Sequence, residues 1–296
     1  SSDLHLNSAD DFSVTVNTIR DFTINQFNLR GKLLTLGAEM DFQDIDRDGI
    51  QDIIVCTQVN DSVFLSIIDD IHSKPTRHHE LFVDRTGQLN DRGDYLFISG
   101  GCSDLNGDGH LEYLFVINGG YSLQPRRVYA VDLVRDTIYR SPSSGAGILE
   151  VSTADLDGDR RDEILLKTVA PYNFKQPVPY HDSVSWLMVL DDDLQFYRPP
   201  SVIHPAPSWI ELKSFEMEGD PYVLALTRHH RTMGYSSRLI LMNSSMDVLS
   251  TRNWEAEENR PVDLWQVPGS TDLNDIKLLV NKGLYTLNPD LEFIDS

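Results

Sequence analysis

An acidic motif that occurs three times constrains the fold of this chain more than any other feature. Each copy has Asp or Asn at positions 1, 3 and 5 and a further acid at position 9, and an apolar run follows; the copies span 44–55, 104–116 and 155–166. Their first positions are 60 and 51 residues apart. Because self-similarity at a period of some tens of residues is the signature of a repeat architecture, we expect a fold built of repeated units.

Each copy of the motif is expected to lie in a β-hairpin. Strand-compatible runs, such as 33–42 and 95–102, precede the acids, and β-branched or aromatic runs, such as 53–55, come directly after them. This order predicts two strands joined by a loop that carries the acids. Two weaker echoes follow at 215–226 and 272–280, which brings the number of repeats to five.

Repeats of about 50 to 60 residues have room for four short strands, which is the size of a propeller blade. We therefore predict an all-β chain that forms a single β-propeller domain over 1–296, with about five four-stranded blades, or a part of a larger propeller. The expected repeat units are 30–90, 91–141, 142–200, 201–255 and 256–296. Strands at 12–29 are expected to complete the last blade, which would remove a free sheet edge.

The acidic loops have the ligand chemistry of a calcium site. Carboxylates at positions 1, 3 and 5 of a tight loop converge on one point, a Gly at position 6 permits the turn, and hard oxygen ligands suit calcium. The position 9 acid and the backbone carbonyl of position 7 are expected to complete the coordination. The predicted ligands of two or three calcium ions are Asp44, Asp46, Asp48, Ile50, Asp52, Asp104, Asn106, Asp108, His110, Glu112, Asp155, Asp157, Asp159, Arg161 and Glu163.

Two other interpretations of these loops are weaker. An EF-hand needs a bidentate Glu at position 12, where this chain has Val55, Phe115 and Leu166. Asp and Asn also favour turns without any metal, but that preference does not explain three copies in the same frame. The third loop departs from the pattern because Arg160 replaces the Gly, and the fourth and fifth repeats lack the full ligand set.

The pattern Asp-x-Asp/Asn-x-Asp-Gly-x-x-Asp/Glu, followed by an apolar strand, resembles the FG-GAP/VCBS repeats. Such repeats occur in the propeller of integrin α-subunits and in many secreted bacterial proteins. The resemblance implies a calcium-binding β-propeller and leaves the function open. Arg160 and the incomplete fourth and fifth copies depart from the pattern, and these departures concern the number of metal ions rather than the fold.

The net charge of −21 argues against nucleic acid or an anionic membrane surface as a partner, since both would repel the chain. Three calcium ions would bring the formal charge from −21 to −15. No apolar run approaches the roughly 18 residues that span a bilayer, so we expect no direct membrane insertion of this segment. With only Cys56 and Cys102, the chain is not a disulfide-stapled scaffold.

Three long loops are expected on the face opposite the acidic loops, because they join second and third strands. They span 118–127, 170–181 and 228–235, and they concentrate Tyr, Phe, Arg and His on an otherwise acidic protein. Loops on a rigid scaffold commonly carry function, and a protein, a glycan or a small anionic ligand would find its complement there. The candidate ligand-binding residues are Tyr121, Arg126, Arg127, Tyr172, Phe174, Tyr180, His229, Arg231 and Tyr235.

The sequence contains no nucleophile elbow, phosphate loop or HExxH motif, so we expect that the chain is not an enzyme. The expected function is a ligand-binding module stabilised by structural calcium, such as a sensor ectodomain or an adhesion propeller. The alternative is a carbohydrate-active enzyme or its targeting module, because some polysaccharide lyases resemble this architecture. An extracellular, periplasmic or cell-surface location is expected, with the signal or anchor in a flanking segment that this chain does not contain.

Overall fold

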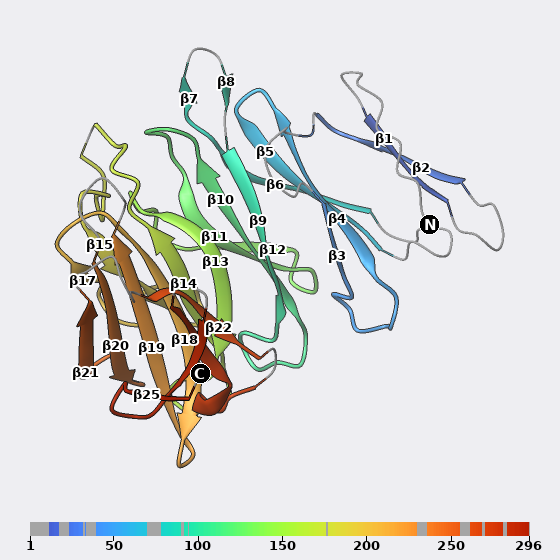
Figure 1. Ribbon diagram of the computed structural model, residues 1–296. Helices are drawn as coiled ribbons and strands as arrows, with labels where there is room; N and C mark the ends of the chain where they lie inside the picture. Colours follow the sequence, from blue (N-terminus) through green and yellow to red (C-terminus); the bar gives the residue numbers. More distant parts are fainter. Residues whose placement is uncertain are drawn as a thin grey trace. The chain divides into compact units, whose positions relative to one another are not determined.

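A computed structural model describes residues 12–17, 24–31, 33, 40–69, 78–89, 92–93, 95–175, 177–229, 236–254, 261–267, 270–280 and 283–295. Across these residues the chain is all-β, as predicted: its strands pair in antiparallel sheets, and the described segments contain no α-helix (Figure 1). None of them contains a helix long and apolar enough to cross a membrane. The chain divides into two compact units, which we describe separately.

The first unit comprises Ser1–Cys102 and His110–Tyr139. It contains two four-stranded sheets and two small hairpins, β1–β2 and β7–β8. Its strands are β1 (Phe12–Asn17), β2 (Ile24–Leu29), β3 (Met40–Gln43), β4 (Asp52–Val59), β5 (Ser62–Ile68), β6 (His78–Arg85), β7 (Gln88–Leu89), β8 (Arg92–Gly93), β9 (Tyr95–Ser103), β10 (Glu112–Gly119), β11 (Arg126–Asp132) and β12 (Thr137–Arg140).

The second unit comprises Ser103–Gly109 and Arg140–Ser296. Its elements are β13 (Gly147–Ala154), β14 (Glu163–Val169), β15 (Ser185–Leu187), β16 (Val189–Leu190), β17 (Ser201–His204), β18 (Ser208–Met217), β19 (Asp220–His229), β20 (Ser237–Asn243), β21 (Val248–Trp254), β22 (Pro261–Gln266), the 3-10 turn η2 (Leu273–Asp275), β23 (Ile276–Val280), β24 (Gly283–Leu287) and β25 (Phe293–Asp295).

The second strands of three expected repeats, β4, β10 and β19, are largely buried, and their sequences show why. β4 and β10 are almost uninterrupted apolar runs, and nearly every residue of both is buried. In β19, alternate side chains enter two different clusters: Leu224 and Leu226 pack in one, and Val223 and Ala225 in the other. Since successive side chains of a strand point to opposite faces, this sheet is packed on both sides.

Three four-stranded sheets and four strands of a larger sheet match the predicted repeats. The strands β3–β6, β9–β12, β18–β21 and β22–β25 pair as neighbours in chain order, and they fall inside the expected units 30–90, 91–141, 201–255 and 256–296. The strands β1 and β2 pair with each other, in register from Phe12↔Leu29 to Asn17↔Ile24. That the 12–29 segment completes the last blade stays a prediction, as does the number of blades.

The expected unit 142–200 differs from the prediction. Instead of a separate four-stranded sheet, β13 and β14 join β18–β21 in a seven-stranded sheet in which β16 also pairs with β14, and β15 pairs with β17. The segment after β14 contains Pro171, Pro177 and Pro179. Proline has no N–H for a sheet ladder, and the described residues of this segment form no long third strand. The end of β14 pairs instead with β18 at Thr168↔Ile210.

Candidate functional site

The three acidic loops lie where the sequence predicts them, between the first and second strands of a hairpin. Residues 44–51 join β3 to β4, 104–111 join β9 to β10, and 155–162 join β13 to β14. All three use the same backbone contact, in which the N–H of position 6 donates to the carboxylate of position 1. The bonds are Gly49 N to Asp44 Oδ2 at 3.0 Å, Gly109 N to Asp104 Oδ2 at 2.9 Å and Arg160 N to Asp155 Oδ2 at 3.0 Å.

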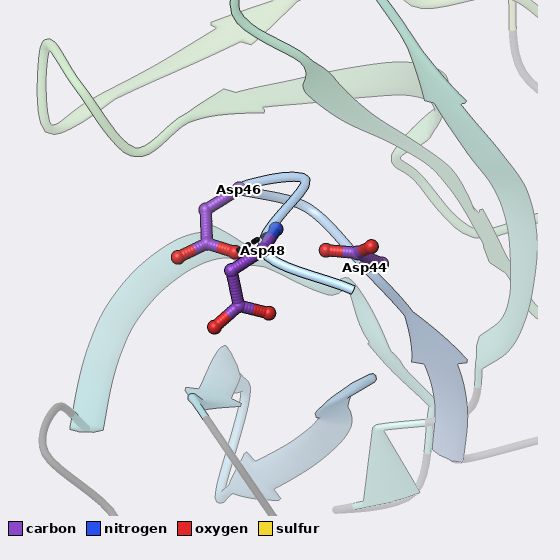
Figure 2. A group of neighbouring side chains, drawn as sticks. All are labelled: Asp44, Asp46 and Asp48. Carbon is purple, nitrogen blue, oxygen red and sulfur yellow. Dashed lines mark hydrogen bonds between the residues drawn. The ribbon is translucent and has the colours of Figure 1, made fainter. Parts of the chain in front are cut away.

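In the first loop, the carboxylates of Asp44, Asp46 and Asp48 gather around one space. One oxygen from each lies within 4.8 Å of the other two. Figure 2 shows Asp46 and Asp48 side by side with the Asp44 carboxylate directed toward them, and the dashed line is the 3.2 Å bond from Asp48 N to Asp46 Oδ1. Gly49 turns the chain with a φ of 88°, a conformation that glycine adopts without strain.

The Asp44 carboxylate has one oxygen that lacks a partner. Oδ2 accepts the bond from Gly49, but Oδ1 is buried and has no hydrogen-bond donor among the described residues. A buried, unsatisfied polar atom costs about 1–3 kcal/mol, and more when it is charged. A cation held between Asp44, Asp46 and Asp48 would satisfy this oxygen, so the donor set fits a bound metal ion.

The third loop has the same arrangement as the first. One oxygen each of Asp155, Asp157 and Asp159 lies within 4.8 Å of the others. Arg160 occupies the glycine position with a φ of 70°, so the turn is kept although the residue is not Gly. The next residue, Arg161, directs its guanidinium to Asp192, 2.9 Å away. The predicted ligand role of Arg161, Ile50 and His110 concerns their backbone carbonyls and stays a prediction.

In the second loop, one ligand position is neutral. Asp108 N donates to both Asp104 Oδ1 and Asn106 Oδ1, each at 3.0 Å. The side-chain oxygens of positions 1 and 3 therefore face the same point, as in the other loops. Because Asn106 carries no charge, we expect this loop to bind a cation more weakly than the first loop.

Two of the position 9 acids bind the backbone N–H of position 2 in their loops. Asp52 Oδ2 accepts a 3.0 Å bond from Ile45 N, and Glu163 Oε2 accepts a 2.7 Å bond from Leu156 N. Asp52 and Glu163 are buried, as is Glu112. Burial, followed by repulsion from the three aspartates of its loop, raises the pKa of Glu163 to about 7. These acids thus organise the loop backbone, and their predicted role as direct calcium ligands stays a prediction.

Within the first unit, the candidate ligand-binding residues differ in their exposure to solvent. Tyr121 is exposed, but Arg126 is buried, with its guanidinium 3.3 Å from the carbonyl oxygen of Gly120. Arg127 lies 3.8 Å from Asp84. The two arginines belong to the start of β11, where pairing with β10 packs them, so Tyr121 is the candidate most available to a ligand.

The candidates of the second unit are mostly packed as well. Tyr172 is exposed, whereas Phe174 is buried. The Tyr180 ring packs edge-on against Trp186 and Phe196, with centroids 5.4 and 5.1 Å away. His229 contacts His204. Arg231 and Tyr235 lie outside the described residues.

Sequence reasoning missed a cavity of about 430 Å³ in the second unit. It lies beside the third acidic loop, since Asp155 and Leu156 line it together with residues of β13, β18 and the segment after β22. The lining is rich in hydroxyl groups and includes one cation; these residues are Ser152, Thr153, Ser214, Ser270, Thr271 and Lys213. No local sequence pattern joins them, because they come from three separate segments.

Comparisons with known proteins give little further information. No family model and no curated protein match the chain. A crystal structure of an ACO/RPE65 chimera is similar with a TM-score of 0.38 and 13% identity, over 96% of this chain. The alignment spans 66% of the chimera's length.

The prediction that this chain is not an enzyme does not stand beside a match to an ACO/RPE65 chimera, and it is withdrawn. At a TM-score of 0.38 the similarity assigns neither a fold nor a reaction to this chain.

Proposed function

We propose that this chain is a calcium-stabilised ligand-binding module of the β-propeller type, built from repeats that resemble FG-GAP/VCBS units. The observation that carries the proposal is the buried Asp44 Oδ1, which has no donor among the described residues and belongs to a three-carboxylate loop. The second and third loops support it, because they repeat the same backbone contact from position 6 to position 1.

The chemistry of the loops favours calcium among the common ions. All side chains that converge in the loops offer oxygen, which suits hard cations, and there is no His or Cys in the two three-carboxylate groups. Magnesium demands a near-ideal octahedron and gives up its water reluctantly, whereas calcium accepts six to eight oxygens in flexible geometry. A loop with three nearby carboxylates and open sides leaves room for water in the remaining positions.

The expected affinity supports an extracytoplasmic location. Asp46 and Asp48 are exposed, so each ion would keep several waters and would be held weakly. Extracellular calcium modules bind with dissociation constants of about 10⁻⁴–10⁻³ M. Such sites fill only where free calcium is abundant, and this agrees with an extracellular, periplasmic or cell-surface protein.

The binding role of the module rests on different features. The exposed Tyr121 and Tyr172 and the hydroxyl-lined cavity are the described surfaces that suit a ligand. A cavity of about 430 Å³ is in the range of small-molecule sites. A protein, a glycan or a small anionic ligand remains the proposed class of partner.

Calorimetric titration of calcium into the chelated protein tests the metal proposal. We expect two or three sites in the wild type and one fewer saturable site in Asp44→Asn, because the buried oxygen would lose its negative charge. Asp290→Asn, which removes an exposed acid outside the loops, is the matched control and should bind as the wild type does. Absence of binding heat, or equal stoichiometry in Asp44→Asn, would contradict the proposal.

A further inference from the structure

Two histidines far apart in the sequence meet side by side in the second unit. His204 ends β17 and His229 ends β19. Their Nε2 atoms lie 3.0 Å apart, and the two rings are nearly perpendicular, with an interplanar angle of 87°. Both side chains are partly accessible to solvent. This pair has no part in the acidic loops.

A metal-free pair leaves one ring nitrogen unsatisfied. His204 Nδ1 lies 3.2 Å from Ala206 N and 3.4 Å from the carbonyl oxygen of Ala206, so it has a partner whether it accepts or donates a proton. The two Nε2 atoms can share one hydrogen bond, with either ring as the donor. His229 Nδ1 is buried and has no partner among the described residues. Direct hydrogen bonding therefore does not satisfy both rings.

The same geometry matches two ligands of one metal ion. Imidazole nitrogens bind first-row metals at about 2.0–2.1 Å, and two of them in adjacent positions near 90° lie about 3 Å apart. When Nε2 is a ligand, Nδ1 must carry the proton and needs an acceptor, which the described residues supply for His204 but not for His229. The carbonyl oxygen of Ala206, 3.4 Å from His204 Nδ1, is such an acceptor, and metal-bound histidines usually donate to one.

We propose that His204 and His229 form a site for a tetragonal transition-metal ion, with the other coordination positions open to water or an anion. Copper(II) is the preferred occupant, because it binds nitrogen ligands most tightly in the divalent series and favours ligands at right angles. Burial lowers the pKa of both histidines, and His229 and Arg238 lower that of His204 further.

Titration with Cu²⁺ tests the site, in a buffer with excess calcium to fill the acidic loops. Electron paramagnetic resonance should show one equivalent of tetragonal Cu²⁺ with splitting from two nitrogen ligands. His204→Gln and His229→Gln should each weaken binding at least tenfold. His78→Gln changes an exposed histidine of β6 in the first unit and should bind as the wild type does.

The spectrum of the wild type tests the copper proposal even if a variant fails to fold. An all-oxygen spectrum, or no binding at millimolar Cu²⁺, would overturn the proposal. So would unchanged affinity in folded His204→Gln and His229→Gln. Because the two histidines lie outside the acidic loops, loss of calcium binding in Asp44→Asn should leave the copper signal intact, and the two proposals fail separately.

Discussion

Arg160 adopts a left-handed backbone conformation at the position where the first two loops have Gly49 and Gly109. This conformation costs a non-glycine residue about 1–2 kcal/mol. Arg160→Gly should therefore raise the free energy of unfolding by about 1 kcal/mol, as measured by denaturant melts in chelator. In calcium, the gain should be larger, because the positive charge beside the predicted ion is also removed.

The reverse substitution is the matched control. A Cβ at Gly109 would meet no atom within 4 Å, so Gly109→Arg tests backbone strain without a clash. It should destabilise the protein by about the same amount. If neither substitution changes the free energy of unfolding, the turn must relax to another conformation in the variants.

At the residue scale, the sequence predicts the loop acids well because all the ligands lie within a few consecutive residues. The His204 and His229 pair is different, since 25 residues separate its members and only the pairing of strands brings them together. The burial of Arg126 is likewise set by packing, although its residue type suggested an exposed binding group.

Among the elements, β13, β14 and β18 are connected by charged side chains. Lys167 Nζ lies 3.1 Å from Glu211 and 3.3 Å from Glu150, and Lys213 Nζ lies 3.3 Å from Glu150. Glu211 is only 3% exposed, whereas the side chain of Glu150 is 47% exposed. Both lysines therefore contact the solvated Glu150, and Lys167 also pairs with the buried Glu211.

Lys167→Met should destabilise the protein by about 3 kcal/mol, because it leaves the buried Glu211 without its cation. Lys213→Met should cost less than about 1 kcal/mol, because its partner is well solvated. Burial, followed by the hydrogen bond with Asp263, raises the pKa of Glu211. Acid therefore neutralises the unpaired carboxyl in Lys167→Met, and the loss of unfolding free energy should be smaller at pH 5 than at pH 7. Denaturant melts at pH 5 and pH 7 measure this, and equal losses in both variants would refute it.

The sequence predicts the hairpins at this scale because apolar runs and acidic turns alternate along the chain. It does not predict that β14 pairs with β18, since that contact depends on which strand edge the prolines after β14 leave open. The hydrophobic pattern determines which residues form strands, whereas the availability of unpaired strand edges determines which strands become neighbours.

For the whole molecule, calcium should contribute measurably to stability. At free calcium ten times the dissociation constant, each ion contributes roughly 1.4 kcal/mol, so three ions would give about 4 kcal/mol. Chelation should then lower the melting temperature by about 10 °C, and calcium, but not equimolar magnesium, should restore it. An unchanged melting temperature in scanning calorimetry would mean that the acidic turns hold no structural ion.

The ligands of each predicted ion come from a short stretch of consecutive residues, as in 44–48, and this affects how the protein folds. Such a loop needs no distant part of the chain, so it can hold an ion as soon as its own two strands have paired. Calcium would then stabilise each hairpin as a local nucleus and shorten the search for the remaining strand pairing. A protein that enters a calcium-rich compartment unfolded would gain speed of folding as well as stability.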